Sequence, residues 1–399
     1  MKAFKLGPPG ARSASALRVT MLGLRGFPDV QGGVETHAQN LALQLVELGC
    51  KVEVLTRSGY IPRGSSRSWR GIELVRLWSP RIKGLEAFVH SFLGVLRAAC
   101  TRPDILHIHA IGPALFTPLA RALGLRVVVT HHVLNYENEK WGALARAILR
   151  LGERAGMIFA NGRIAVSREL ARCMERIYHV PVTAIPNGIA MPQAVQSTAI
   201  LQAFGLVPFR FVLMVARIDE QKRQLDLLEA FGRVEHHGWK LAFAGGVDYT
   251  GDYARAVHEC ARKIPGVVML GHQGREELAQ LYGHAAVFVL PSSHEGQPIA
   301  VLEALSYGCP AILSDIPAHR ELALVGIELF PVGDIPDLAD RLERCFRQPA
   351  IDRLSAAERE RIMRGHDWGQ IAQRTLNVYI DALRRGAGGL THDSPRLSP

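Results

Sequence analysis

Residues 290–310, LPSSHEGQPIAVLEALSYGCP, contain the pattern that decides the fold. The apolar run Val287–Leu290 predicts a buried strand, and the polar loop Ser292–Gln297 follows it closely. The apolar spacing after Pro298 then predicts a helix, which ends at Gly308. A strand, a loop and a helix in this order indicate one βα unit of an α/β protein.

Two carboxylates lie in this unit, Glu295 in the loop and Glu303 in the helix. The backbone N–H groups around Pro298–Ala300, at the start of the helix, favour an anion. Carboxylates that bind hydroxyl groups beside an anion site would suit a nucleotide sugar. An ordinary βα turn with a surface glutamate and a capping glutamate is the competing interpretation, and this stretch alone does not decide between them.

The same rhythm of strands and helices recurs along the whole chain. With 399 residues, 48% of them hydrophobic, the chain is long enough for about two domains with full cores. Strands that alternate with helices predict parallel sheets wrapped on both faces. We place the two domains at residues 18–191 and 192–365, a final helix at 366–384, and flexible tails at 1–17 and 385–399.

Charge is distributed unevenly between the two halves of the chain. Residues 1–190 carry 25 basic and 12 acidic side chains, a net charge of +13, whereas residues 191–399 have a net charge of −3. A basic first half favours an anionic partner, such as a phospholipid surface, a lipid diphosphate or nucleic acid. Nucleic acid ranks last because the chain has no recognised nucleic-acid-binding motif.

Cysteine usage and the apolar runs indicate a cytosolic protein. The six cysteines are scattered without a CxxC pair, which favours reduced thiols over a disulfide framework or a zinc site. Residues 1–17 lack the apolar segment of a secretory signal. No run of about 18 apolar residues occurs, so the sequence predicts no membrane-spanning helix.

A glycine pair and two histidine pairs are the candidate site residues of the first half. Gly32-Gly33 precedes a predicted helix, Val34–Leu48, and permits close approach of a ligand to the backbone. Its spacing does not match G-x-G-x-x-G, so a dinucleotide fingerprint is not supported.

The pairs His107/His109 and His131/His132 lie at predicted strand ends, where ligands of open α/β sheets collect. A metal site is one interpretation, but no acidic or cysteine partner stands at ligand spacing. Buried histidines with satisfied hydrogen bonds are therefore favoured, with His109 as a candidate for the wall of a cleft.

Two segments of the first half could contact a membrane surface. Arg81–Cys100 combines cations with apolar residues at helical spacing, a pattern that suits a membrane interface. A helix packed on the sheet is the favoured alternative for this segment. The basic segment Lys140–Arg154 is a second candidate surface.

Two cations mark the start of the second half. Arg217 and Lys222 closely follow the predicted strand Phe209–Val215. An arginine fork and a lysine point charge suit a diphosphate. Asp219 and Glu220 lie between them, so a solvated charge cluster is equally consistent with this stretch.

Five motifs, in their order along the chain, resemble those of the retaining glycosyltransferases of family 4, which have the GT-B fold. They are Gly32-Gly33-Val34-Glu35, Thr130-His131-His132, Ile185-Pro186-Asn187-Gly188-Ile189, Arg217 with Lys222, and the E-x7-E pattern from Glu295 to Glu303. The resemblance covers nearly the whole chain. Leu22–Leu55 and Tyr136–Trp141 further resemble transferases of bacterial surface-polysaccharide assembly, including the rhamnosyltransferase-like group.

The resemblance implies two Rossmann-like parallel-sheet domains that face each other across a cleft, the first binding the acceptor and the second the donor. Arg217 and Lys222 would hold the donor diphosphate and stabilise the leaving nucleotide. Glu303 would bind the ribose hydroxyls and Glu295 the donor sugar, which His132 would face from the other domain. The remaining donor contacts would be Gly32, Gly33, Gly245, His272, Gly296, Gln297, Pro298 and Ile299, and the acceptor contacts Glu35, His109 and His131.

One departure from the family pattern concerns the histidines. Val133 stands where the family's T-x-H-[DG] has Asp or Gly, and the histidine before it is doubled. The sequence therefore leaves open whether His131 or His132 faces the sugar.

The implied reaction transfers a sugar from a UDP-, GDP- or dTDP-sugar with retention of the anomeric configuration, and without a metal or other cofactor. The acceptor would be a lipid-linked glycan or an oligosaccharide of bacterial cell-surface polysaccharide biosynthesis, reached at the cytoplasmic face of the inner membrane by peripheral association. A nucleotide-sugar 2-epimerase of similar architecture and a non-catalytic nucleotide-sugar-binding protein are the alternatives. The intact set Arg217, Lys222, Glu295 and Glu303 argues against both.

Overall fold

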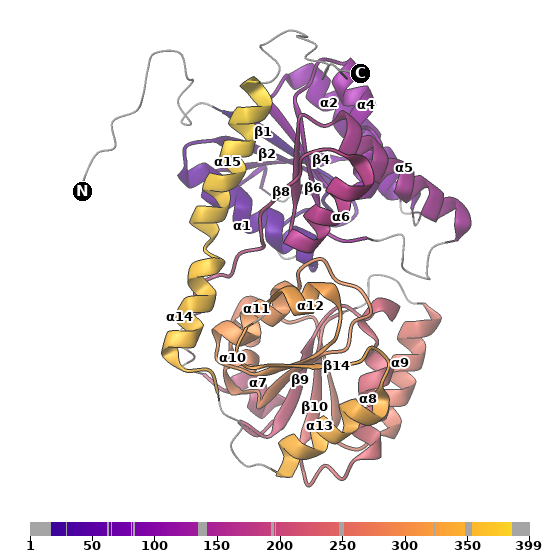
Figure 1. Cartoon of the computed structure of the whole chain (residues 1–399), viewed down its shortest axis with the longest axis vertical. Coiled ribbons are helices and arrows are strands. Elements are labelled where there is room, and N and C mark those ends of the chain that lie inside the picture. Colours follow the sequence, from indigo (N-terminus) through magenta and orange to yellow (C-terminus); the bar gives the residue numbers. More distant parts are fainter. Residues whose placement is uncertain are drawn as a thin grey trace, which may run out of the picture.

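The strands of the chain form two sheets, each covered by helices, as Figure 1 shows for the computed structural model. This arrangement confirms the expected α/β fold of two Rossmann-like domains. The predicted tails and the run Tyr136–Trp141 lie outside the described residues, as do Arg81 and Lys83. The structure describes residues 17–28, 30–61, 64, 66–80, 82, 84–134, 142–192, 195, 197–246, 251–322, 324–347 and 353–384.

The first sheet has the strand order β3-β4-β2-β1-β5-β6-β7-β8. All neighbouring strands are parallel except the short pair β3 and β4. Its strands and helices are β1 (Arg18–Leu22), α1 (Gly33–Glu47), β2 (Lys51–Arg57), β3 (Ser68–Trp69), β4 (Ile72–Leu77), α2 (Leu85–Thr101), β5 (Ile105–His109), α3 (Ile111–Ala114), α4 (Thr117–Ala122), β6 (Val127–His131), α5 (Ala143–Phe159), β7 (Gly162–Ala165), α6 (Arg168–Tyr178) and β8 (Thr183–Ala184).

The central strands of this sheet are buried on both faces because helices cover both. Every residue of β5 and β6 is buried, as a parallel sheet between two helical layers requires. One core cluster packs under α1, and the other packs under the helices from α2 to α6. The carboxyl ends of β1, β5 and β6 therefore meet at one edge of the domain.

The second sheet is wholly parallel, with the strand order β11-β10-β9-β12-β13-β14. A single core cluster runs through this domain. Its elements are α7 (Ala199–Ala203), β9 (Phe211–Val215), the 3-10 turn η3 (Glu220–Lys222), α8 (Gln224–Arg233), β10 (Lys240–Ala244), α9 (Asp252–Lys263), β11 (Val267–Gly271), α10 (Arg275–His284), β12 (Val287–Leu290), α11 (Ile299–Ser306), β13 (Ala311–Ser314), α12 (Pro317–Leu322), β14 (Ile327–Phe330) and α13 (Ile335–Arg347).

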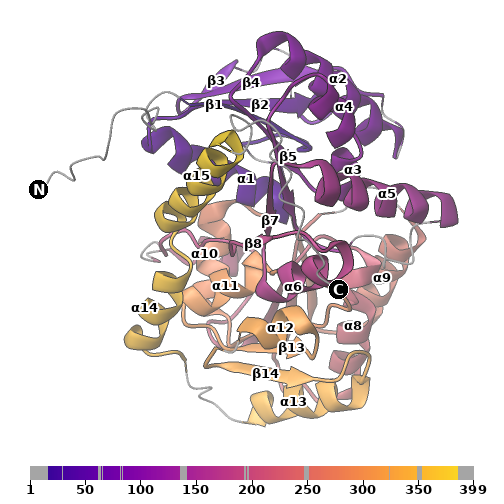
Figure 2. The same cartoon turned by 45° about the horizontal axis from the view of Figure 1, so that its top comes forward.

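The chain ends by crossing back to the first domain. Helix α14 (Ala356–Gly365) packs on α11, whereas α15 (Trp368–Arg384) packs beside α1 (Figures 1 and 2). Trp368 and Tyr379 of α15 belong to a core cluster of the first domain. The backbone N–H of Ile189 donates to the carbonyl of His366 at 2.8 Å, so the two crossings of the chain between domains lie side by side.

Several predicted boundaries differ from the structure. The sequence predicts one helix at Pro113–Leu123, but the structure has two short helices, α3 and α4, because Pro118, near the N-terminus of α4, has no N–H to continue the first one. The sequence also predicts a strand at Val180–Pro186, of which only β8 pairs. By contrast, the predicted strands Lys240–Ala244, Val287–Leu290 and Ala311–Ser314 have the same bounds as β10, β12 and β13.

Candidate functional site

A cleft of about 420 Å³ lies between the two domains, at the carboxyl ends of both sheets. Its volume falls within the range of small-molecule sites, roughly 300–1,000 Å³. All the predicted donor-side residues line it, from both domains: Gly32, Gly33, His132, Arg217, Lys222, Gly245, His272, Glu295, Gly296, Gln297, Pro298, Ile299 and Glu303. The predicted acceptor residues Glu35, His109 and His131 are not part of its lining.

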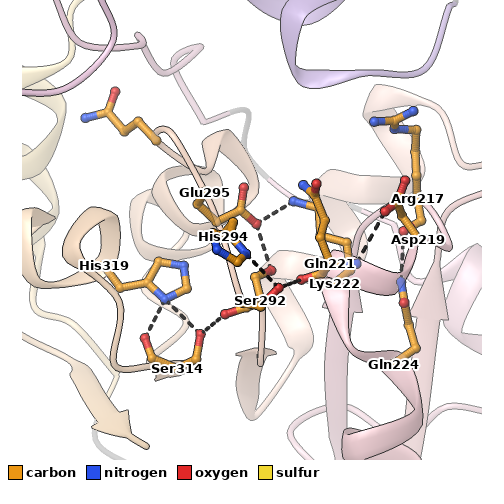
Figure 3. Close-up of polar contacts among 12 residues, drawn as sticks. Arg217, Asp219, Gln221, Lys222, Gln224, Ser292, His294, Glu295, Ser314 and His319 are labelled. Carbon is orange, nitrogen blue, oxygen red and sulfur yellow. Dashed lines mark hydrogen bonds and ion pairs between the residues drawn. The ribbon is translucent and has the colours of Figure 1, made fainter. Parts of the chain in front are cut away.

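The loop between β12 and α11 is tied to the turn after β9, as Figure 3 shows. Lys222 Nζ forms an ion pair with the Glu295 carboxylate, to which the Ser292 hydroxyl also donates at 2.7 Å. The N–H of Ser293 donates to the carbonyl of Gln221 at 2.8 Å. Cation and carboxylate are therefore held at one place in the cleft.

Further hydrogen bonds join this loop to the end of β13 (Figure 3). The hydroxyl of Ser314, at the end of β13, donates to the carbonyl of Ser292. His319 Nδ1 lies 2.7 Å from the carbonyl oxygen of Ser314. Burial lowers the pKa of His319, so a neutral ring donates to that carbonyl.

The segment that carries Arg217 is held in the same way. The Asp219 carboxylate accepts from the N–H of Gln221 at 3.3 Å and starts the 3-10 turn. The side-chain amide of Gln224 donates to the carbonyl of Arg217 at 2.8 Å. Both cations, Arg217 and Lys222, thus project from a backbone with fixed bonds into the cleft.

Helix α11 presents its N-terminus to the cleft. Pro298 is the N-cap of this helix and directly precedes its first turn. The N–H groups of Ile299 and Ala300 belong to that first turn and therefore have no acceptor within the helix. One turn further on, Glu303 accepts from the Tyr282 hydroxyl at 3.1 Å. Burial raises the pKa of Glu303, although that hydrogen bond and the charge of Arg275 act against it.

The glycine pair before α1 has two different roles. A Cβ at Gly33 would meet nothing within 4 Å, so this position is open toward the cleft. Gly32 has a φ of 152°, and a Cβ there would collide with Glu35 and Arg25. Gly32 is therefore required by the fold, whereas Gly33 leaves space for a ligand.

The assignment of Glu35 to acceptor binding does not agree with its position. Its carboxylate is buried and accepts from Arg25 Nε at 3.0 Å. Burial would raise the pKa of Glu35, but the charges of Arg25 and Arg217 hold it below its usual value. Glu35 holds Arg25 beside the glycine pair rather than facing the cleft.

The doubled histidine is resolved by the strand that carries it. Residue 131 is the last of β6, and its ring turns to Glu153 of α5, with Nε2 2.8 Å from the carboxylate. His132 follows the strand and lines the cleft. His131 therefore does not contact an acceptor from this position, and His109 lies behind His132, with ring nitrogens 3.3 Å apart.

Two contacts at the cleft were not predicted from the sequence. Gln31 accepts from the N–H of Gly246 at 3.1 Å across the domains. Asn187 belongs to the motif Ile185–Ile189, but its bonds were not predicted: it donates to the carbonyl of Gln297 at 2.8 Å and contacts His37 at 2.8 Å. Asn187 and His37 are 150 residues apart, so no local spacing indicates their contact.

Two family models match the chain. Residues 31–191 match the model described as Glycosyltransferase Family 4, and residues 210–348 match that of Glycosyl transferases group 1. The chain belongs to the glycosyltransferases of family 4. The predicted transferase activity and the GT-B architecture are thus confirmed at the level of the family.

Curated relatives of this transferase match over nearly their full length. An alpha-maltose-1-phosphate synthase of Mycobacterium tuberculosis is 28% identical over 91% of this chain and 99% of its own. A GDP-mannose:cellobiosyl-diphosphopolyprenol alpha-mannosyltransferase of Komagataeibacter xylinus is 27% identical over 90% of this chain and 92% of its own. The two relatives are named for different substrates or products, so membership of the family does not identify the substrates of this chain. The finer likeness to rhamnosyltransferases stays a prediction.

Among solved structures, a sucrose-phosphate synthase from Thermosynechococcus elongatus superposes with a TM-score of 0.79 at 20% identity. The match covers 93% of this transferase and 100% of that chain. At this identity the likeness concerns the fold, and it agrees with two facing Rossmann-like domains.

Proposed function

We propose that this family 4 transferase moves a sugar from a nucleotide-sugar donor to a lipid-linked glycan or oligosaccharide acceptor, with retention of the anomeric configuration. The observation that carries the proposal is the composition of the cleft. Arg217, Lys222 and the N-terminus of α11 supply positive potential at one place. Glu295 and Glu303 supply carboxylates beside it.

In this proposal the donor lies along α11. The diphosphate binds at the helix N-terminus, near Ile299, and the two cations stabilise the charge that develops on the leaving nucleotide. Glu303 accepts from the ribose hydroxyls, and the base lies toward His272. The sugar lies between Glu295 and His132, one from each domain.

The proposed chemistry is front-side displacement without a metal. The anomeric carbon exchanges its bond to the donor phosphate oxygen for a bond to the acceptor oxygen, and that phosphate oxygen takes the acceptor proton. In this proposal Glu295 positions the sugar and does not act as a covalent nucleophile. Without the donor its carboxylate pairs with Lys222 and accepts from Ser292. Lys222 would turn toward the donor phosphate when the donor binds.

The acceptor assignment rests on chemistry and on one relative. The K. xylinus relative is named for a cellobiosyl-diphosphopolyprenol acceptor, and a basic first domain suits such a lipid diphosphate. The structure also offers a surface for the membrane that would hold it. We place the reaction at the cytoplasmic face of a bacterial inner membrane, in cell-surface polysaccharide synthesis.

Helix α2 gives this membrane proposal a structural basis. Its inner face packs on the sheet through Val95 and Ala98. Its outer face carries an apolar stripe, 38–47% exposed, which consists of Leu85, Phe88, Phe92 and Leu96. The inner face agrees with the predicted helix packed on the sheet. Contact of the outer face with a membrane is part of the present proposal. Among the described residues no helix is long and apolar enough to cross a membrane.

A second exposed surface of the first domain, on α5, carries cations. Helix α4 contacts both α2 and α5 (Figure 2). Helix α5 exposes Arg146, Arg150 and Arg154 together with Leu144 and Leu151. Apolar side chains beside cations suit the interface of an anionic membrane.

The donor assignment is tested by a screen that follows release of UDP, GDP or dTDP from a set of nucleotide sugars, with and without polyprenyl-diphosphate glycans. We expect Lys222→Ala and Glu303→Ala each to lower turnover of the accepted donor by about a hundredfold or more. The matched controls are Lys263→Ala and Glu360→Ala, exposed residues away from the cleft. NMR of the product gives the anomeric configuration.

Two results would contradict the proposal. Wild-type turnover in both cleft variants, in samples whose thermal unfolding is unchanged, would rule out the site assignment. A product with inverted configuration would rule out the retaining mechanism, and an isomerised nucleotide sugar without transfer would favour an epimerase.

A further inference from the structure

Three buried histidines from three different elements converge beneath the floor of the cleft. They are His37 of α1, His109 at the end of β5, and His132 after β6. Each offers one ring nitrogen, and the three nitrogens lie within 4.8 Å of one another. Among the described residues this is the one group of histidine, cysteine and acidic side chains that could hold a metal ion.

We propose that His37, His109 and His132 form a binding site for a transition-metal ion of the zinc type, open to the cleft through His132. Imidazole nitrogen is a preferred ligand of Zn²⁺, Cu²⁺ and Ni²⁺ and a poor one for Mg²⁺ and Ca²⁺. Three protein ligands leave a fourth position of a tetrahedral ion for water or a ligand in the cleft.

The spacing of the ring nitrogens supports this site. His109 Nδ1 and His132 Nε2 are 3.3 Å apart. Two nitrogens bound to one tetrahedral zinc ion lie about 3.3 Å apart, given Zn–N bonds of about 2.0–2.1 Å. The ring of His37 lies close to both of these rings. Its centroid is 4.9 Å from that of His132 and 5.8 Å from that of His109.

Hydrogen bonds around the cluster prepare the rings for an ion. The Asn187 side-chain oxygen lies 2.8 Å from His37 Nδ1. The amide of Asn187 donates to the carbonyl of Gln297, so its oxygen must accept from His37. This bond fixes the tautomer that has its lone pair on Nε2, which is how outer hydrogen bonds orient metal-binding histidines.

Burial decides the protonation state of the three rings. Burial keeps all three rings uncharged by lowering their pKa values, to about 4 for His37. Neutral imidazole is the form that binds metals.

The nearest other histidines are excluded from the site by their own bonds. The two ring nitrogens of His107 lie 2.7 Å from the Thr130 hydroxyl and 2.7 Å from the Tyr379 hydroxyl. The ring of His131 turns to Glu153. The cluster is thus specific to three of the buried histidines in this region.

Occupancy of the site would regulate the transferase, an inference that rests on the proposed function. A bound ion takes up the Nε2 atom of His132 and fixes the orientation of a ring that would otherwise face the donor sugar, so it should compete with the donor. The ion supplies no step of the transfer itself.

Metal binding is tested without any substrate. The full chain, freed of metal with a chelator, is titrated with Co²⁺ while the visible absorption of tetrahedral Co²⁺ is recorded, and then with Zn²⁺ in competition. We expect one ion per chain and a rise in the midpoint of thermal unfolding. His37→Gln and His109→Gln should each lower the affinity at least tenfold.

The matched control is His90→Gln. His90 is equally buried, and it lies on α2, outside the cluster. This variant should bind Co²⁺ like the wild type. No tetrahedral absorption in the wild type, or equal binding by folded His37→Gln and His109→Gln, would overturn the site.

Regulation is tested separately in the presence of the accepted donor. Zn²⁺ should raise the donor KM of the wild type at least several-fold and have no such effect on His37→Gln. An unchanged KM in a wild type that binds the ion would overturn the regulatory role. Since the Co²⁺ titration needs no donor, its outcome does not depend on whether the proposed donor is correct.

Discussion

Single residues of the cleft differ in whether the fold or a ligand requires them. The adjacent glycines show this most clearly. Gly32 has a backbone conformation and neighbours that exclude a side chain, whereas Gly33 has an ordinary φ and open space around its Cβ direction. The fold alone does not explain a glycine at position 33, because alanine there would favour the helix.

We therefore expect Gly33→Ala to leave the midpoint of thermal unfolding unchanged or slightly raised, since alanine stabilises such positions by about 0.4–1 kcal/mol. The added methyl group would occupy space that the donor needs, so the donor KM should rise about tenfold or more. Differential scanning fluorimetry and initial-rate kinetics measure the two effects.

Gly32→Ala is the matched comparison. Its methyl group would collide with Glu35 and Arg25, so this variant should unfold at lower temperature. If Gly33→Ala instead kept wild-type kinetics, the close approach of the donor to this backbone would be refuted.

At the scale of elements, the sequence predicts structure best where apolar runs are short and bounded by polar loops. β10 and β12 have the predicted bounds for this reason. The donor-side residues were also predictable, because they belong to motifs at the ends of such strands. All of them line one cleft.

Contacts between distant elements could not be predicted in the same way. Which histidine faces the cleft depends on how far β6 continues. The sequence predicts this strand at Val127–Thr130, whereas β6 continues through His131. Glu35 has its partner ten residues away, in Arg25. The third histidine of the cluster comes from α1, far from β5 and β6 in sequence, where local spacing gives no signal.

Helix α2 allows a prediction about the membrane. Phe88 and Phe92 are 47% and 40% exposed. Their double replacement by serine should weaken binding to vesicles of phosphatidylglycerol and phosphatidylcholine about thirtyfold, because about 1 kcal/mol of apolar burial per ring, or about 2 kcal/mol in all, is lost. Binding of the wild type should also weaken as salt screens the cations of the first domain. Vesicle flotation measures both effects.

The control for this experiment replaces Val325 and Val332, exposed apolar residues of the second domain, with serine. That variant should float with vesicles like the wild type. Salt-independent flotation, or equal flotation of the two double variants, would contradict a membrane surface on α2.

For the whole molecule, the cleft exists only while the two domains stay together. The chain crosses between them at Ile189 and His366. A second connection lies away from this point, where α12 of the second domain meets α6 of the first (Figures 1 and 2). There the Glu321 carboxylate accepts from the backbone N–H groups of Arg168 at 2.6 Å and Glu169 at 2.9 Å.

This contact places a negative charge at the N-terminus of α6, where the helix dipole favours it. Glu321→Ala should therefore weaken the contact that holds the two domains together. The donor KM should rise about tenfold, because hydrogen bonds to a charged group contribute about 1.5–3 kcal/mol and the exposure of this contact reduces that value. Small-angle scattering should show a larger radius of gyration. Glu321→Gln keeps one acceptor and should lie between the two.

Glu343→Ala is the matched control, because Glu343 pairs with Arg347 within α13 and does not cross between domains. Its loss of charge should leave both the donor KM and the radius of gyration unchanged. If Glu321→Ala also left both unchanged, α6 and α12 would contribute nothing to closure, and contacts near the cleft, such as that of Gln31 with Gly246, would have to hold the domains together. A change in KM without a change in radius would instead place the role of Glu321 in the alignment of the two walls, because His132 and Glu295 must approach one sugar from opposite domains.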